Sequence, residues 1–120
     1  MVTIQHQEST LFLVPQVRVD ALGWEPLPGS RGVEHRAVYL GERVVAGQLR
    51  MAPGGGEAAH LHGRGEHHLW VLSGAVVIDD TRLEAGSYVH VPAHVLHELV
   101  DAGAGSLLLY VSTGAGASRP

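Results

Sequence analysis

Apolar and polar residues alternate in two neighbouring stretches of the chain, residues 34–40 and 43–51. This period of two is typical of β-strands, in which successive side chains point to opposite faces of a sheet. Gly41 and Glu42 separate the two stretches and predict the turn of a β-hairpin. From residue 45 to residue 51 the odd-numbered positions are apolar or glycine, and we expect their face to pack on the core.

Short apolar runs continue along the chain and predict further strands over residues 10–14, 58–62, 67–73, 75–78, 82–83, 88–91, 97–100 and 106–111. Gly and Pro residues separate these runs, with a long loop expected over residues 20–32, a break at 53–56 and a turn at 79–80. No stretch has the apolar spacing of a helix of three turns. Many short strands with such punctuation predict an all-β sandwich or small barrel.

The length and composition are those of one folded unit. A chain of 120 residues, 45% of them hydrophobic, is expected to form a single domain over residues 1–120 with a substantial core. The polar residues 1–9 and the residues 113–120, rich in Gly, Ala and Ser, are expected to be flexible. The absence of cysteine excludes disulfides and thiolate metal ligands.

The charges are sparse and scattered. The formal net charge is −4, and the eight basic residues are all Arg, spread along the chain without a basic stripe. This distribution argues against a nucleic-acid partner. The chain also lacks an apolar run long enough to cross a membrane and a signal-peptide pattern at residue 1, so we expect a cytoplasmic protein with no membrane partner.

Seven of the nine histidines fall between His60 and His97, which singles out one candidate site. His60 and His62 bracket a single residue, and a His-x-His pair on a strand places both rings on the same face. His67 and His97 complete a set spaced like the ligands of one metal ion. Imidazole is a common ligand of Fe, Ni, Cu and Zn.

Two motifs in residues 54–101 resemble those of the cupin family. In the first, Gly54 is followed by five residues, His60-Leu61-His62, four residues, His67, six residues and Gly74. In the second, Gly86 is followed by five residues, Pro92-Ala93-His94, two residues, His97, three residues and Asp101. The chain is similar to single-domain cupins related to anti-sigma-factor sensor domains and to small dioxygenases.

The resemblance implies a cupin-type double-stranded β-helix, or jelly-roll barrel, that forms a homodimer. It implies one divalent transition metal held by His60, His62, His67 and His97, with Fe favoured over Mn, Ni, Zn or Cu. The chain departs from the family pattern at three positions: His67 replaces Glu, His94 replaces the Gly of Pro-x-Gly, and Asp101 replaces Asn.

Glu66 lies one residue before the position at which the family carries a ligand. The six residues between His67 and Gly74 favour His67 as the ligand, and a slip of one residue turns a side chain to the opposite face of a strand. Glu66 is then a solvated acid or an acceptor that orients a ligand histidine. Four neutral imidazoles leave a divalent ion its full charge, which acidifies bound water and attracts anionic or enolate-forming substrates.

We expect a metal-dependent oxidoreductase of the dioxygenase type that acts on a small oxygenated organic substrate. The first alternative is a metal-dependent isomerase or lyase in which Glu66 or His94 carries a proton. Arg50 is a further candidate, because an Arg facing the cavity would bind a carboxylate or enolate oxygen, whereas the plain alternative is a surface Arg. The second alternative is a non-enzymatic domain that senses a metal or ligand.

Overall fold

The computed structural model describes residues 11–60, 65–95 and 97–114, apart from the side chains of residues 58–60. The described part contains one short helix, α1 (Gln16–Asp20), and strands β1 (Glu25–Pro26), β2 (Ser30–Leu40), β3 (Val44–His60), β4 (Glu66–Ser73), β5 (Ala75–Ile78), β6 (Thr81–Glu84), β7 (Tyr88–Val91), β8 (His97–Asp101) and β9 (Ser106–Thr113). The flexibility predicted for residues 1–9 lies outside the described residues. Of the tail predicted to be flexible, residues 113–120, only 113 and 114 are described, and Thr113 is the last residue of β9.

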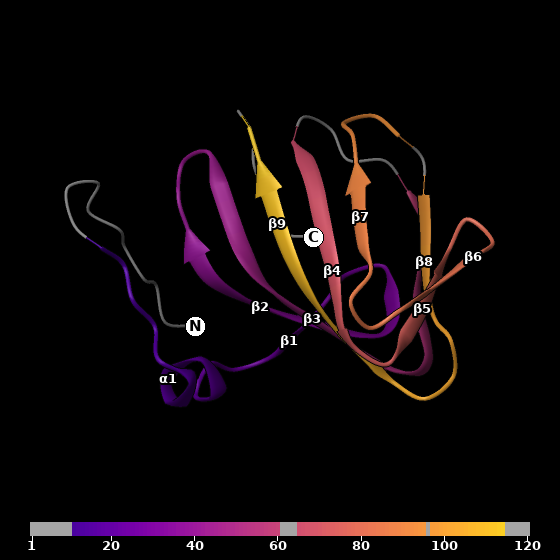
Figure 1. Cartoon of the computed structure of the whole chain (residues 1–120), viewed down its shortest axis with the longest axis horizontal. Coiled ribbons are helices and arrows are strands. Elements are labelled where there is room, and N and C mark those ends of the chain that lie inside the picture. The colour runs from indigo at the N-terminus through magenta and orange to yellow at the C-terminus, as the bar shows by residue number, and fades with distance from the viewer. Residues whose placement is uncertain (1–10, 61–64, 96, 115–120) are drawn as a thin grey trace.

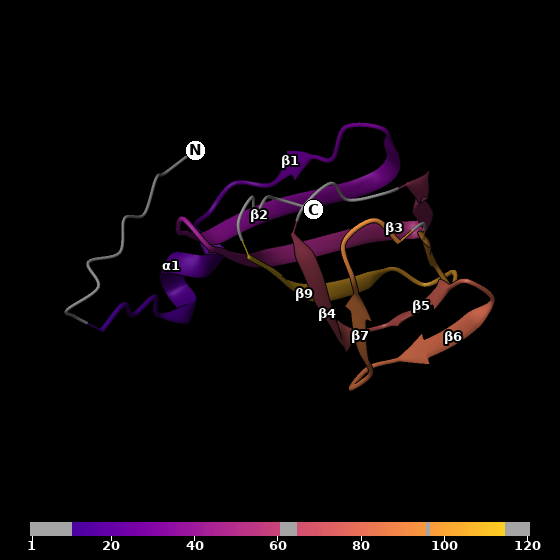
Figure 2. The same ribbon diagram turned by 90° about the horizontal axis from the view of Figure 1, so that it is seen from above.

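The strands form one antiparallel sheet that curls into a nearly closed barrel (Figures 1 and 2). Its order is β6-β5-β8-β3-β9-β4-β7, with β2 paired to β3 and β1 paired to β2. The predicted all-β class is therefore confirmed. No helix among the described residues is long and apolar enough to cross a membrane.

The β2–β3 hairpin matches its prediction, and the N–H of Gly41 donates to the carbonyl of Val44 at its turn. The predicted break at residues 53–56 is wrong, because β3 continues through them and changes partners. Along one edge β3 pairs with β2 from Val45 to Glu57, and along the other edge it pairs first with β9 and then with β8. Gly54 has φ +73°, so the strand bends there without losing its place in the sheet.

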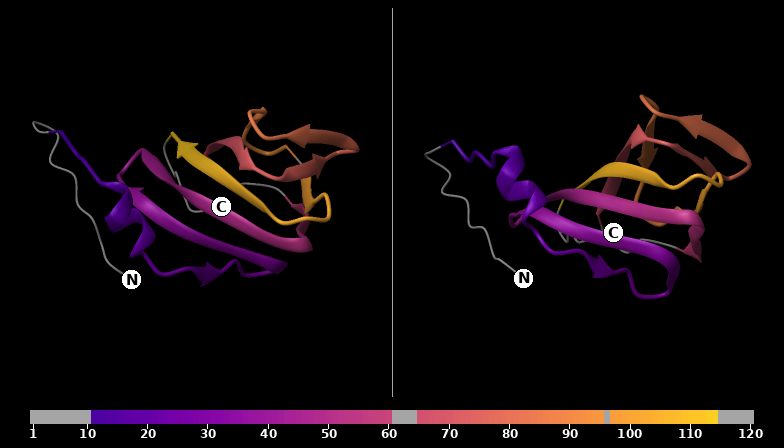
Figure 3. Two further views of the ribbon diagram at one scale, coloured as in Figure 1. Left: turned by 60° about the horizontal axis from the view of Figure 1, so that its bottom comes forward. Right: turned by 90° about the horizontal axis from the view of Figure 1, so that it is seen from below.

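The segment before β2 differs from its prediction. Residues 11–14 form no strand, and the expected loop over residues 20–32 contains β1, which occupies the outer edge of β2. The apolar side chains of Leu11 and Leu13 are 86% and 73% exposed, so they gain no core contact. The single turn of α1 begins where the carbonyl of Pro15 accepts two backbone N–H groups, and it lies beside the β2–β3 hairpin, away from β5 and β6 (Figure 3).

The core forms from side chains that lie opposite one another across the sheet. Leu49 pairs with Leu108, and Leu108 pairs with Val71 on β4; all three side chains are at most 2% exposed. This row follows from the alternation on β3, whose odd-numbered positions 45–51 are buried as predicted. Burial of such rows on the inner face stabilises the barrel.

Gly47 lies opposite Tyr110, which is fully buried. A Cβ atom at residue 47 would lie 2.2 Å from the carbonyl oxygen of Arg36 and 2.8 Å from the Tyr110 hydroxyl. The first of these distances involves backbone, which cannot move without breaking the β2–β3 pairing. Only glycine therefore allows the Tyr110 ring and β2 to approach β3 so closely.

We predict that Gly47→Ala lowers the free energy of unfolding by about 1 to 3 kcal/mol through overpacking. The matched control is Gly23→Ala, because no atom lies within 4 Å of the position its Cβ would take. The control is expected to stay within about 0.5 kcal/mol of the parent. Urea denaturation of the three proteins measures both values, and equal stability of the two variants would contradict the packing argument.

Candidate metal centre

His67 lies on the inner face of β4. Buried and exposed side chains alternate on this strand, and His67, Leu69 and Val71 are 2%, 4% and 2% exposed. His67 pairs with Ser112 on one side and with Val91 on the other, and both neighbours are also buried. The imidazole therefore belongs to the barrel interior, among largely apolar side chains.

His97 lies on the inner face of β8, where it is 6% exposed. Its Nδ1 lies 3.3 Å from the carbonyl oxygen of Val95. A carbonyl only accepts hydrogen bonds, so Nδ1 carries the proton and Nε2 of the neutral ring carries the lone pair. This arrangement is typical of a metal-binding histidine, whose other ring nitrogen donates to a nearby oxygen.

The barrel brings the strands of these histidines together at one end. His67 pairs with Val91, and the chain returns after residues 92–96 at His97, which pairs with the backbone of His60. The chain enters β4 and β8 at the same end of the barrel (Figure 1). The described side chains of the predicted ligand set are those of His67 and His97; the side chain of His60 and the whole of His62 lie outside the described residues.

Four further polar residues lie in the interior, and the sequence reasoning missed them. His35 and Glu57 are 5% and 9% exposed, and Tyr110 and Ser112 are fully buried. None of the four is without a partner. Two signals in the sequence could have indicated them. His35 alternates with apolar residues that share its face of the strand, and Glu57 comes shortly before the first histidine of the candidate site on the same strand.

Two candidate catalytic residues lie on the outer face instead. The side chain of Glu66 is 51% exposed, and its Oε1 lies 3.0 Å from Nε2 of His90. The side chain of Arg50 is 47% exposed and forms an ion pair of 2.8 Å with Glu34. Both strands alternate, so these side chains point away from the face that carries His67. The structure does not bring them together with His67 and His97.

His94 occupies the corner between β7 and β8. It is exposed and has φ +63°, in the left-handed region that glycine adopts readily. This backbone angle explains the Gly of the Pro-x-Gly pattern that His94 replaces. The backbone of His94 therefore forms the turn between β7 and β8, and this role is independent of its imidazole.

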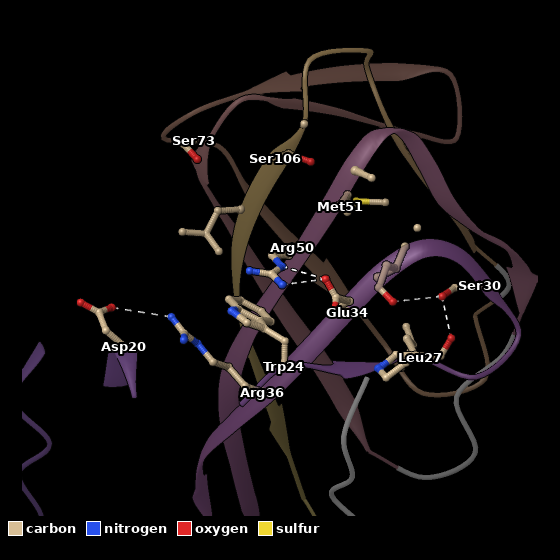
Figure 4. Close-up of a pocket in the computed structure, with 16 residues that line it drawn as sticks. Asp20, Trp24, Leu27, Ser30, Glu34, Arg36, Arg50, Met51, Ser73 and Ser106 are labelled. Carbon is tan, nitrogen blue, oxygen red and sulfur yellow. Dashed lines mark hydrogen bonds and ion pairs between the residues drawn. The ribbon is translucent and has the colours of Figure 1, made fainter. Parts of the chain in front are cut away.

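A pocket of about 850 Å³ lies beside the outer face of β2 and β3 (Figure 4). The Trp24 ring contacts two guanidinium groups, those of Arg36 at 4.2 Å and Arg50 at 4.4 Å. Burial lowers the pKa of Arg36, Asp20 raises it and Arg50 lowers it further. Neither His67 nor His97 lines this pocket, so it is separate from the interior histidines.

Asp101, the last residue of β8, ties the bend of β3 at Gly54 to the loop between β8 and β9. It is 4% exposed, and its Oδ2 accepts hydrogen bonds from the backbone N–H groups of Gly54, Gly103 and Gly105 at 3.0, 2.7 and 3.1 Å. Burial raises the pKa of Asp101, but the hydrogen bonds from Gly103, Gly105 and Gly54 outweigh it and hold the pKa below its ordinary value. Asp101 therefore has a structural role: its carboxylate holds the bend of β3 and the β8–β9 loop together, and we call this arrangement the Asp101 clasp.

A nearly closed antiparallel barrel with inward-facing histidines at one end defines the cupin class of proteins. The chain matches the family described as the ChrR cupin-like domain over residues 15–117. The protein therefore belongs to the ChrR cupin-like family, and the resemblance read from the two motifs is confirmed. No curated protein matches the chain.

Solved structures support the fold. The polyketide cyclase RemF from Streptomyces resistomycificus is 22% identical, with a TM-score of 0.72 over 84% of this chain and 80% of that one. An RmlC-like cupin from Shewanella frigidimarina is 23% identical, with a TM-score of 0.68 over 78% and 85%. The complex of Rhodobacter sphaeroides SigE with the anti-sigma ChrR matches at 25% identity and a TM-score of 0.67, over 81% of this chain and 51% of that one.

We predict that Asp101→Asn lowers the free energy of unfolding at pH 7 by about 1 to 3 kcal/mol, because a neutral oxygen accepts the three N–H groups less strongly. A depressed folded-state pKa contributes stability that is present above the unfolded value of about 3.9 and is lost as pH falls through the folded value. The difference between parent and variant should therefore shrink below about pH 4.

Urea denaturation at pH 7 and at pH 3 measures this difference. Asp80→Asn is the matched control, because Asp80 is an exposed carboxylate in the turn between β5 and β6. A difference between parent and Asp101→Asn that does not change with pH would show that the carboxylate charge does not hold the clasp.

Proposed function

We propose that the protein is a metal-dependent oxidoreductase of the dioxygenase type that acts on a small oxygenated organic molecule inside the barrel. The observation that carries the proposal is the burial of His67 and His97 on inward faces at one end of the barrel. Two imidazoles on inward faces at the same end of the barrel suit metal binding, because the neutral ring offers a nitrogen lone pair to transition metals.

We assign His60, His62, His67 and His97 as the metal ligands. The described donors fit this assignment, since His67 is buried and the contact of His97 Nδ1 with the Val95 carbonyl leaves Nε2 of the neutral ring to bind the ion. Fe(II) is the favoured ion, and Mn, Ni, Zn and Cu are the alternatives that imidazole also suits. When bound, the ion supplies a Lewis acid for substrate oxygens and redox chemistry for reaction with O2.

The chain's own residues supply the surroundings of the reaction. Leu69 and Val71 share the inner face of β4 with His67 and exclude water from the interior. The hydroxyl groups of Tyr110 and Ser112 are buried on the neighbouring strand β9, so we assign them to orient oxygen atoms of the substrate. Glu57 is a buried carboxylate on the strand that ends at His60, and we assign it to hold or accept a proton.

A second candidate function is a non-enzymatic domain that senses a metal or small ligand. The family match itself favours it, together with the structural match to a complex between a sigma factor and the anti-sigma ChrR. In either case we propose that the protein works as a homodimer. Exposed apolar side chains such as those of Leu11 and Val17 would then be covered by the second copy.

We predict that His67→Ala binds much less iron than the parent protein. Both are first treated with a weak chelator, which removes iron from exposed sites and leaves iron bound in the interior. Glu66→Ala should retain it, because Glu66 lies on the opposite face of β4. Elemental analysis of parent and variants measures this, with circular dichroism to confirm folding and His97→Gln as a second ligand variant. Retention in His67→Ala with loss in Glu66→Ala would show that the ligand register is wrong.

We predict that the iron-loaded protein consumes O2 with a β-diketone or a catechol-like compound, and that His67→Ala lowers this rate at least about 100-fold. An oxygen electrode together with product analysis measures the reaction. Turnover without O2 in the Zn- or Mn-loaded protein would instead identify an isomerase or lyase. Tight metal binding without turnover would leave the sensing function.

A further inference from the structure

We propose that Glu66, His68 and His90 form a second metal site, on the outer face of β4 and β7, that binds zinc. This site is distinct from the one assigned to the barrel interior and does not depend on it. It lies on the solvent side of the same strand that carries His67 inward, so the two sites would be separated by the thickness of the sheet.

The register of β4 and β7 places the three ligands together. His68 pairs directly with His90, and the two rings stack with centroids 5.0 Å apart and planes inclined by 17°. Glu66 precedes His68 by two residues and therefore shares its face of the strand. One ligand atom from each residue lies within 4.8 Å of the other two.

These distances lie within reach of a zinc site. Zinc binds His nitrogen and carboxylate oxygen at about 2.0 to 2.2 Å, so ligand atoms around a tetrahedral ion lie about 3.3 Å apart. The Glu66 oxygen and Nε2 of His90 are already 3.0 Å apart. Their side chains are 51% and 42% exposed, so small side-chain rotations can close the remaining gap without movement of the sheet.

Tyr88 and Trp70 hold the His68 ring in place. Nδ1 of His68 lies 2.6 Å from the Tyr88 hydroxyl, and the ring stacks on Tyr88 and on Trp70 at 6.0 and 6.4 Å. When Nδ1 donates to the hydroxyl, Nε2 carries the lone pair that a metal requires. An oxygen acceptor on the second ring nitrogen also raises the basicity of a ligating imidazole.

The ligand set selects the metal. Two imidazoles and one carboxylate suit zinc-class ions, whereas Mg²⁺ and Ca²⁺ prefer sites made entirely of oxygen. Three protein ligands leave a fourth position for water, as in open zinc sites. The carboxylate of Glu66 partly neutralises the charge of the ion. This lowers the free-energy cost of moving that charge from water to a half-buried site.

Titration of the metal-free full-length protein with Zn²⁺ by calorimetry tests the proposal. We expect His90→Ala and His68→Ala each to lose one equivalent of bound zinc relative to the parent. The matched control is His94→Asn, because His94 is an exposed histidine of the next corner and Asn also adopts its left-handed backbone. The control should keep the full stoichiometry of the parent.

Unchanged zinc stoichiometry in both His90→Ala and His68→Ala would overturn the proposal and leave the trio as a hydrogen-bonded surface cluster. Circular dichroism checks that each variant is folded. His67→Ala reports on the interior site separately, and it should keep the equivalent that His90→Ala loses. Failure of the interior assignment and failure of the outer site are therefore distinguishable.

Discussion

The register of β4 between β9 and β7 is the constraint on which the rest of the structure depends. Leu69 and Val71 anchor it, because their inner positions belong to the buried rows of the core. The same register turns His67 inward and sends its two neighbours in sequence to solvent. A slip of one residue would exchange the two faces, placing a carboxylate and a different imidazole in the interior.

Much of the fold follows from patterns that the sequence displays directly. Alternation predicted the β2–β3 hairpin, because one half-buried face leaves a clear period of two, and short apolar runs predicted strands β5 and β7. The continuity of β3 through Gly54 was not predictable in the same way. A glycine-rich run predicts a break, whereas here the backbone bends and stays paired because β8 replaces β9 along one edge while β2 continues along the other.

The candidate site was only partly predictable. Spacing within the two motifs selected His67 and His97, which the structure places in the interior. The burial of Glu57 was not predicted, because the strands that flank it, β2 and β8, are distant in sequence. The contact between His68 and His90 on the outer face was not predicted for the same reason. It depends on the β4–β7 register, which no local motif indicates.

The clasp at Asp101 gives the barrel two unlike ends. At one end a single carboxylate accepts the N–H groups of Gly54, Gly103 and Gly105, so the bend of β3 and the β8–β9 loop are held at one point. At the other end the chain enters β4 and β8, beside the interior histidines. The end held by Asp101 resists widening, so under the proposed function a substrate would enter and leave the barrel at the histidine end.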